Sequence, residues 1–358
     1  MRWQKAYFEI IAGDRQGMVA RVIRGALRPA AWLYQYITAC RNFCFHTGLR
    51  QSTRVDVPVI SVGNLTTGGT GKTPIVACVV EQLQTLKRQP GIVSRGYRAD
   101  ATGINDEKRV LEHLCPGIIH LQNPNRVTAS VQLIKEHDVD VVVLDDGFQH
   151  RQIARDLDMV LIDATNPFGY EFVLPRGLLR EPLQGLQRAH MIVVTRCDQV
   201  PAAQLEMIED QICYAAPQHK DRLARVSFRP VGFLCASGEK LPLSQIEAKR
   251  VMIVTAIGNP GAFEDTCRRL GAEIVCCRVF PDHHHYSQSD LESILRDAAK
   301  HRVTAVLTTL KDLVKIQPAQ VQSDQEQEIL ILALQIATVF DSTKGEELLH
   351  SVLQEVLS

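Results

Sequence analysis

"VISVGNLTTGGTGKTPIV", residues 59–76, joins an apolar run, a glycine-rich loop and a Lys-Thr pair that opens a helical pattern. A strict phosphate-binding loop reads GxxxxGK[ST], and this stretch fits its end but has Thr66 at the position of the first glycine. Glycines inside the loop still let consecutive backbone N–H groups turn toward an anion, and the following helix offers its positive end. The residues predicted to contact a nucleotide are Gly68, Gly69, Thr70, Gly71, Lys72 and Thr73.

Two residues of this loop carry the chemistry of a triphosphate site. Lys72 is expected to reach the β- and γ-phosphates, and the Thr73 hydroxyl is expected to ligate Mg²⁺. The alternative is a strand-to-helix turn that binds nothing. The order of strand, loop, Lys-Thr and helix favours a nucleotide site.

A second polar cluster follows another apolar run, in "DVVVLDDGFQH" (140–150). Asp145 and Asp146 stand at the carboxyl end of this predicted strand, where a phosphate-loop protein needs an acid to organise its metal. An Asx-turn or a helix cap is the alternative. Beside a phosphate loop, a magnesium site is the favoured interpretation.

The remaining pattern predicts an α/β fold, because continuous apolar runs indicate parallel strands covered by helices on both faces. Expected strands are 58–62, 91–94, 139–144, 158–162, 190–195, 223–228, 251–255, 274–279, 303–308 and 329–334. Expected helices between them are 73–88, 126–137, 201–215, 260–270, 287–301 and 343–356. The predicted division is an N-terminal segment 1–56, a P-loop NTPase-like parallel-sheet domain 57–228, an irregular linker 229–249 and a smaller α/β/α domain 250–358.

Composition excludes some classes. The 358 residues carry 40 basic and 40 acidic side chains, so a nucleic-acid partner gains no support from net charge. None of the ten cysteines forms a CxxC pair, which argues against a zinc or redox motif and for reduced thiols.

The N-terminal segment is locally basic. Residues 15–55 contain seven arginines and no acid. Arg21, Arg24 and Arg28 share one face of a predicted helix, and Pro29 is expected to start a second helix rich in aromatic residues. The apolar run 29–40 is shorter than the roughly 20 residues of a membrane span. The pattern favours helices that lie on an anionic membrane surface, with a solvated basic face as the alternative.

Three kinds of P-loop protein compete. "VVTRCD" (193–198) is a poor match to the guanine-specificity motif NKxD of switch GTPases, since Thr195 and Arg196 replace Asn and Lys. Thr67 replaces the lysine of the GKGGxGK loop of partitioning or metallochaperone ATPases. The third kind is a kinase with a non-protein acceptor.

An ordered series of motifs makes the third possibility specific. The series is "VGNLTTGGTGKTP" (62–74), "SRGY" (94–97), "LDDGFQHRQIARDLDMVLIDATNPFG" (144–169), "LPRGLLREPL" (174–183), "IGNPGAF" (257–263), "FPDHHHY" (280–286) and "TTLKDLVKI" (308–316). Over about residues 16–340 the chain resembles the tetraacyldisaccharide 4′-kinase family. The resemblance implies transfer of the γ-phosphoryl group of ATP, with Mg²⁺, to the 4′-hydroxyl of a tetraacylated glucosamine disaccharide 1-phosphate in lipid A biosynthesis. It also implies two α/β/α domains joined by a small β linker, working at the cytosolic face of the bacterial inner membrane.

The resemblance extends to the acid–base residues. The family's base is an aspartate in a Gly-Asp-Glu-Pro segment, which corresponds to Asp106 in "INDEKR", with Asn105 and Lys108 in place of Gly and Pro. The family pairs this base with a histidine of its Asp-His-His motif, hence His283. Three consecutive histidines cannot all converge on one ion from an extended chain. His284 stays open as the alternative partner.

Four further residues match charged or aromatic positions of the family. Arg126, Arg180 and Glu181 correspond to charged cleft residues, and arginines suit phosphate on ATP or on the lipid. Surface ion pairing is the alternative for all three. Tyr97 is expected either to line the nucleotide pocket or to pack in the core.

Overall fold

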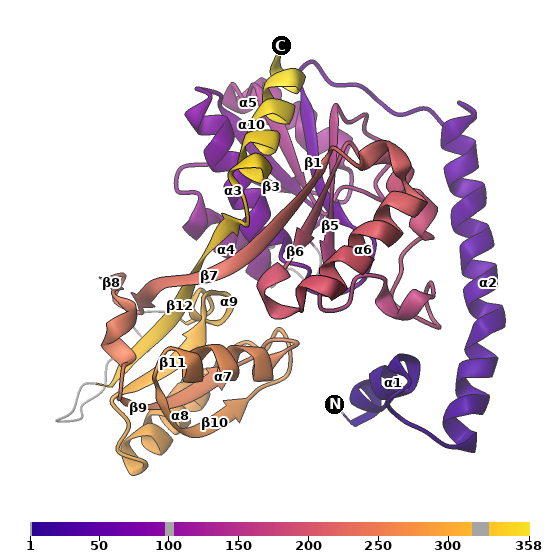
Figure 1. Cartoon of the computed structure of the whole chain (residues 1–358). Coiled ribbons are helices and arrows are strands. Elements are labelled where there is room, and N and C mark those ends of the chain that lie inside the picture. Colours follow the sequence, from indigo (N-terminus) through magenta and orange to yellow (C-terminus); the bar gives the residue numbers. More distant parts are fainter. Residues whose placement is uncertain (1, 97–103, 317–328) are drawn as a thin grey trace. The chain divides into compact units, whose positions relative to one another are not determined.

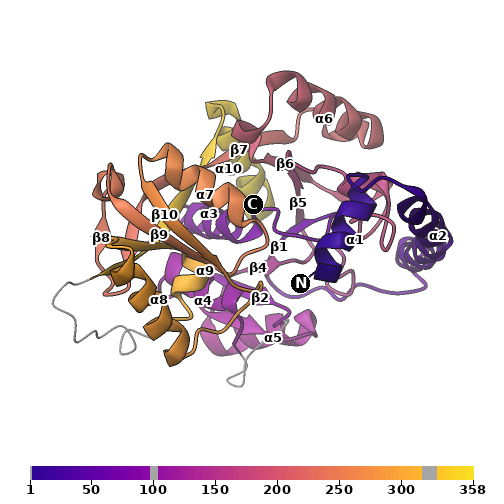
Figure 2. The ribbon, with the colours of Figure 1, turned by 90° about the horizontal axis from the view of Figure 1, so that it is seen from below.

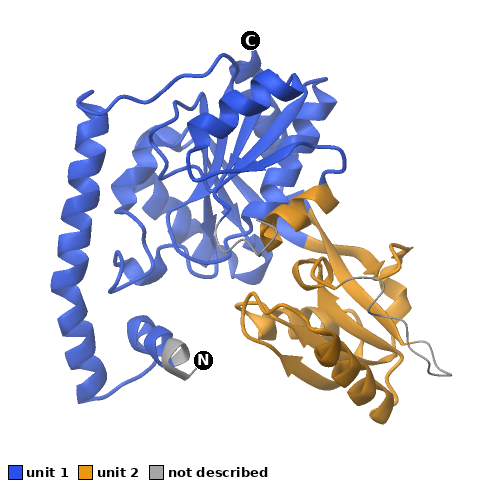
Figure 3. Ribbon diagram, turned by 180° about the vertical axis from the view of Figure 1, so that it is seen from behind, with its two compact units in different colours: residues 1–97, 115–228, 338–358 blue, residues 98–114, 229–337 orange. Residues whose placement is uncertain are grey.

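A computed structural model describes residues 2–96, 104–316 and 329–358 of the chain, with side chains from residue 6 onward. The chain divides into two compact units, coloured separately in Figure 3. Unit 1 comprises residues 1–97, 115–228 and 338–358, and unit 2 comprises residues 98–114 and 229–337. Tyr97 lies outside the described residues.

Unit 1 is built on parallel strands in the order β7-β6-β5-β1-β4-β2-β3, of which β7 to β2 are labelled in Figure 2. Its strands are β1 (Val59–Asn64), β2 (Pro90–Ser94), β3 (His120–Gln122), β4 (Val141–Asp145), β5 (Leu157–Asp163), β6 (Met191–Thr195) and the start of β7 (Leu223–Cys235). Its helices are α1 (Arg2–Ala12), α2 (Met18–His46), α3 (Lys72–Thr85), α5 (Arg126–His137), α6 (Ala202–Ala215) and α10 (Thr343–Leu357). All of these strand pairs are parallel.

The strands of unit 1 are apolar along their whole length because helices cover them. All six residues of β1 and all five of β4 are buried. The apolar face of α5 packs on β1, β2 and β4, and the apolar face of α6 packs on β5 and β6. Burial at about 25 cal/mol per Å² of apolar surface makes this packing the main stabilising contribution.

Helix α2 is one continuous helix with Pro29 inside it, so the expected break at Pro29 is wrong (Figure 1). Proline removes one backbone hydrogen bond, which is a small part of the hydrogen bonding of a 29-residue helix. The buried Ala20, Ala31 and Thr38 lie on one face of α2, and Ala31 joins the core under α6. No helix of the described residues is long and apolar enough to cross a bilayer.

Unit 2 carries strands in the order β10-β9-β11-β12-β7. Strands β10, β9, β11 and β12 are parallel to one another. Strand β12 runs antiparallel to β7, since the N–H of Asp341 donates to the carbonyl of Arg225 and the N–H of Ala236 donates to the carbonyl of Ile331, both at 3.0 Å. Its elements are α4 (Asp106–Leu114), the end of β7, β8 (Lys240–Leu241), β9 (Arg250–Thr255), α7 (Pro260–Arg269), β10 (Glu273–Val279), α8 (Gln288–Lys300), β11 (Ala305–Thr309), α9 (Leu310–Leu313) and most of β12 (Leu330–Phe340). Strand β8 pairs antiparallel with β7. Two apolar clusters, one under α8 and one under α7, form its core.

The α/β fold class is confirmed, and all ten expected strands are present; β3 and β8 were missed because they are three and two residues long. The units differ from the expected division in three ways. Residues 229–235 continue strand β7 rather than forming an irregular linker. Helix α10 belongs to unit 1, and residues 98–114 belong to unit 2. Both reassignments depend on contacts between segments distant in sequence, which local patterns do not encode.

Candidate functional site

The loop of residues 65–71 leads from β1 into α3. Gly71 has φ 84°, and a Cβ there would lie 2.4 Å from Cζ of Phe228, so both the backbone angle and the space require glycine. Lys72 is the first residue of α3 and Thr73, half-buried, is the second. The strand, loop and helix predicted from the sequence are therefore present.

Side chains hold the carbonyl groups of this loop. Asn64 donates to the carbonyl of Thr66 at 2.7 Å, and Thr195 donates to the carbonyl of Thr70 at 2.9 Å. Arg196 donates to the carbonyl of Gly69 at 2.7 Å and pairs with Asp163. Two N–H groups of the loop are also engaged inside the protein: that of Thr67 donates to the carbonyl of Leu178 at 2.8 Å, and that of Thr70 donates to the carbonyl of Gly68 at 3.2 Å. These contacts fix the conformation of the loop.

Thr195 and Arg196 belong to the "TRCD" segment that was weighed as a guanine-reading motif. In the structure their side chains bind loop carbonyls. This arrangement supports the loop and gives no reason to expect a guanine base there.

Asp145 ends strand β4, and its register partner on the neighbouring parallel strand β1 is Val62. The carboxyl end of β4 therefore lies beside the start of the phosphate loop. Asp145 is 5% exposed. Asp146 follows with φ 57°, and its backbone N–H donates to the carbonyl of Val62 at 2.9 Å.

The carboxylate of Asp146 lies among cations. Arg180 Nη1 lies 2.9 and 2.8 Å from its two oxygens, and Lys72 Nζ lies 3.6 Å from Oδ1. Burial raises the pKa of Asp146, but the charges of Lys72, Arg180 and Arg126 outweigh it and hold the pKa below its usual value. Asp146 is therefore an ionised carboxylate at neutral pH.

Arg126 and Arg180 reach this cluster from different segments. Arg126 is the first residue of α5 and is 5% exposed; burial and the charge of Arg95 lower its pKa, while Asp146 and Asp145 oppose the shift. Arg180 lies on a segment that pairs with the phosphate loop, since its N–H donates to the carbonyl of Leu65 at 2.7 Å. The structure thus brings both arginines to the Asp146 cluster.

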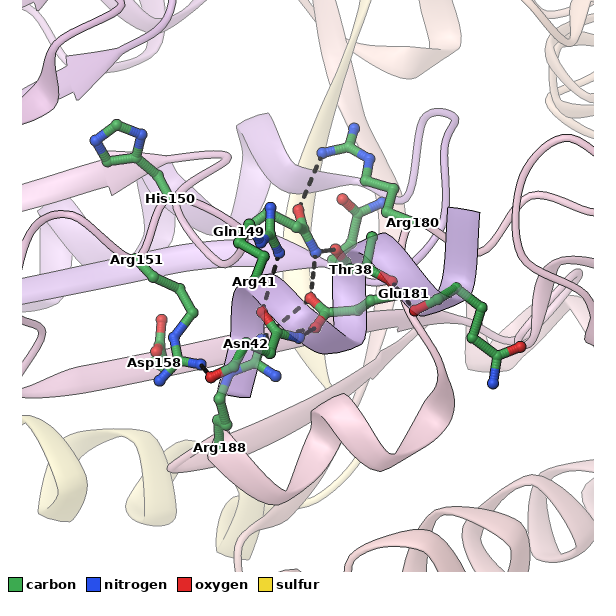
Figure 4. Close-up of polar contacts among 12 residues, drawn as sticks. Thr38, Arg41, Asn42, Gln149, His150, Arg151, Asp158, Arg180, Glu181 and Arg188 are labelled. Atoms are coloured by element: carbon green, nitrogen blue, oxygen red, sulfur yellow. Dashed lines mark hydrogen bonds and ion pairs between the residues drawn. The ribbon is translucent and has the colours of Figure 1, made fainter. Parts of the chain in front are cut away.

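Glu181 points elsewhere, although it adjoins Arg180 in sequence. Its carboxylate is fully buried and accepts hydrogen bonds from Asn42 and Gln149 at 3.1 and 3.0 Å (Figure 4). Arg188 forms an ion pair with it at 2.9 Å. These contacts tie α2 to the core of unit 1, and they show Glu181 as a buried ion-pair partner, which was the alternative to a charged cleft residue.

A second polar cluster lies within unit 2. Asp106 is the first residue of α4, and its side chain is 9% exposed. His283 Nδ1 lies 3.1 Å from its Oδ2, and Lys315 Nζ lies 3.3 Å from the same oxygen. Burial raises the pKa of Asp106, but the hydrogen bond from His283 and the charge of Lys315 outweigh it and lower the pKa below its usual value.

The three consecutive histidines go to three different surroundings. His283, with φ 66°, turns to Asp106. His284 pairs with Asp290 at 3.0 Å and stacks on Phe280 at a centroid distance of 4.5 Å. His285 is exposed. His284 is therefore used inside the fold, and His283 is the histidine that meets the aspartate.

Sequence reasoning gave no role to Lys315, Asn64 or Gln149. Lys315 lies in "TTLKDLVKI", which was quoted only as part of the resemblance. The sequence offered one signal for Lys315: it follows Asp312 by three residues, just after a predicted buried strand.

A parallel α/β sheet with a glycine-rich loop and a Lys-Thr pair between β1 and α3 gives unit 1 the fold of P-loop nucleotide-binding proteins. Comparisons make this specific. The family model described as tetraacyldisaccharide-1-P 4′-kinase matches residues 23–354, and the chain belongs to this family.

Relatives and a solved structure agree with the family match. A tetraacyldisaccharide 4′-kinase of Anaeromyxobacter sp. (strain Fw109-5) is 36% identical over 327 residues, covering 86% of each chain. One of Bdellovibrio bacteriovorus is 29% identical, covering 94% of this chain and 100% of the relative. A crystal structure of LpxK from Aquifex aeolicus in complex with ATP superposes with a TM-score of 0.73 at 24% identity, covering 94% of this chain and 100% of the other, which shows a shared fold.

Proposed function

We propose that this chain is an ATP-dependent kinase that phosphorylates the 4′-hydroxyl of a tetraacylated glucosamine disaccharide 1-phosphate in lipid A biosynthesis. The observation that carries the proposal is the family match over residues 23–354, which runs through both units. The two polar clusters supply the parts that such a reaction needs: a site for the triphosphate in unit 1 and a base in unit 2.

ATP is assigned to the loop of unit 1. Gly68, Gly69 and Gly71 allow the backbone to approach the phosphates, and Thr70 lies between them. Lys72 adds a positive charge that is only 17% exposed, so its attraction to phosphate is weakly screened. The contacts of Asn64, Thr195 and Arg196 with the loop support a preformed cradle.

Mg²⁺ is assigned to Thr73, Asp145 and Asp146. Oxygen ligands suit this cation, and the lowered pKa of Asp146 keeps this carboxylate ionised at neutral pH. When bound, Mg²⁺ neutralises charge on the β- and γ-phosphate oxygens. Arg180 keeps Asp146 in place, and Arg126 is assigned to phosphate.

Asp106 is assigned as the general base, with His283 as its partner. The carboxylate takes the proton of the 4′-hydroxyl, whose oxygen bonds to the γ-phosphorus while the bond to the β–γ bridging oxygen breaks and ADP leaves. A lowered pKa keeps Asp106 ionised at neutral pH, which a base requires. The role of Tyr97 in the nucleotide pocket remains a prediction.

We also propose that α2 lies on the cytosolic face of the inner membrane. The face opposite its buried residues exposes large apolar side chains at helical spacing: Met18, Val19, Val22, Trp32, Leu33, Tyr36, Ile37 and Phe43. A contiguous apolar surface of this kind suits a membrane interface. Of the three arginines on the basic face, Arg21 and Arg28 are exposed, whereas Arg24 donates to the backbone carbonyls of Ile10 and Arg15.

The membrane proposal is tested with Trp32→Ser/Tyr36→Ser on vesicles of phosphatidylcholine and phosphatidylglycerol. Loss of two apolar side chains of about 1.5–3 kcal/mol each is expected to weaken binding by tenfold or more. Tyr214→Ser is the matched control, because Tyr214 is 93% exposed on α6. Equal binding by the double variant and the control contradicts the proposal.

The activity is tested by incubating purified protein with ATP, Mg²⁺ and the tetraacyl disaccharide 1-phosphate, and following the lipid by mass spectrometry. The expected product is the lipid with one added phosphate. Hydrolysis of GTP without a lipid product would instead support a nucleotide switch.

A further inference from the structure

The segment "TTLKDLVKI" (308–316) places two charged side chains in the interior of unit 2. The Asp312 side chain is fully buried and that of Lys315 is 1% exposed. Burying an ammonium group is costly unless carboxylates and hydrogen-bond acceptors surround it. The position of Lys315 therefore needs a reason beyond packing.

Lys315 bridges two carboxylates. Its Nζ lies 3.3 Å from Asp106 Oδ2 and 3.4 Å from Asp312 Oδ1, and it donates to the carbonyl of His284 at 3.2 Å. These three contacts come from three segments of the chain, so the ammonium is held from several directions.

Asp312 is itself fixed. It accepts hydrogen bonds from the backbone N–H of Ala256 at 3.2 Å and from the hydroxyl of Thr309 at 2.8 Å. Thr309 ends strand β11, and Asp312 lies in the single turn of α9. The strand end thus fixes Asp312, and Asp312 fixes Lys315.

We infer that Lys315, anchored by Asp312, is a positioning residue for Asp106, the base of the proposed kinase reaction. Its ammonium and the His283 ring both meet Oδ2, and Oδ1 takes part in neither contact. Held at one oxygen by two donors, the carboxylate keeps one orientation and presents Oδ1 to the acceptor hydroxyl. This inference rests on the proposed function.

The same contact sets the ionisation of the base. Burial alone raises the pKa of Asp106, and the hydrogen bond from His283 and the charge of Lys315 reverse that effect. Removing the ammonium is therefore expected to raise the pKa of Asp106, so that protonation inactivates the base at a higher pH. The charged or titratable groups on α4, on residues 282–286 and on residues 310–315 are Glu107, Lys108, Arg109, Glu112, His113, Asp282, His283, His284, His285, Tyr286, Lys311, Asp312 and Lys315.

The test compares pH–rate profiles of the full chain carrying Lys315→Met and Lys315→Arg. In Lys315→Met the acidic limb is expected to move to higher pH, so that the ratio of the rate at pH 6 to the rate at pH 8 falls by about threefold or more. Lys315→Arg keeps the positive charge, so the acidic limb of its pH–rate profile is expected to lie at the wild-type pH. Lys311→Met is the control: it removes the same charge from the same segment, but Lys311 lies in α9 and pairs with Asp282 at 3.4 Å.

Lys315→Met leaves Asp312 buried without its counter-charge, and this variant is at risk of not folding. The double variant Lys315→Met/Asp312→Asn removes both charges and keeps the acceptor oxygen for Ala256 and Thr309. Carboxyl ¹³C titration of Asp106 in the double variant then reports the base without any turnover. A midpoint higher than in the wild-type chain supports the inference.

The inference about Lys315 would be overturned if folded variants kept both the acidic limb of the wild-type pH–rate profile and the wild-type titration of Asp106. If the wild-type chain does not phosphorylate the lipid, the proposed function fails, and the titration still decides whether Lys315 controls Asp106.

Discussion

Unit 1 and unit 2 each hold an aspartate whose pKa is lowered by nearby cations, but they expose it differently. The Asp146 side chain is 33% exposed and faces Lys72 and Arg180 beside a glycine-rich loop. The Asp106 side chain is 9% exposed and faces His283 and Lys315. A partly exposed carboxylate beside a glycine-rich loop is suited to bind a metal ion, whereas an enclosed carboxylate with a histidine is suited to accept a proton.

The comparison predicts a division of labour. Substitutions in the unit 1 cluster should weaken ATP binding and turnover together. Substitutions in the unit 2 cluster should lower turnover and leave ATP binding nearly intact.

The largest effect is expected for Lys72→Ala. Loss of a positive charge that contacts the triphosphate should lower kcat/KM by about a thousandfold, and ATP affinity, measured by calorimetry, should fall as well. Lys135→Ala, at an exposed position of α5, is the control. Normal ATP affinity in Lys72→Ala would break the assignment of the cradle to unit 1.

His283→Ala should lower kcat by about a hundredfold with ATP affinity unchanged, because Asp106 loses one of its two Oδ2 contacts. The φ of 66° makes alanine strained at this position. His283→Asn is the matched variant, since asparagine tolerates that φ and can still donate a hydrogen bond. Urea unfolding of both variants measures how much of the effect is strain. Normal turnover in a folded His283→Ala chain would contradict the pairing of His283 with the base.

A smaller effect is expected for Gly71→Ala, which should lower the free energy of unfolding by about 2 kcal/mol through the positive φ and the clash with Phe228. Phe228→Leu in the same chain removes much of the clash and should recover part of the loss, as measured by urea unfolding. Strictly additive effects of the two substitutions would show that the ring does not shape the loop.

The two units also differ in how much of each could be predicted from the sequence. Strand β1, the loop and helix α3 are contiguous in sequence, so periodicity and glycine spacing were sufficient to predict these three elements of unit 1. The acid–base cluster joins α4, the loop around His283 and the residue after α9, which lie far apart in sequence. Only the resemblance to a family suggested Asp106 and His283 as a pair.

Two features of the structure, the burial of Glu181 and the continuity of α2, could not be predicted from local sequence patterns. The burial of Glu181 depends on Asn42, Gln149 and Arg188, three side chains from other parts of the chain. The continuity of α2 through Pro29 depends on how much one lost hydrogen bond costs in a long helix, which residue preferences alone do not give.

The most direct test of the account follows ³²P from [γ-³²P]ATP into the tetraacyl disaccharide 1-phosphate, with wild type and Asp106→Asn at saturating ATP. The account predicts labelled lipid from the wild-type chain, and from Asp106→Asn a rate at least about a hundredfold lower with unchanged ATP affinity. Unlabelled lipid from the folded wild-type chain, or a normal rate from Asp106→Asn, would contradict it.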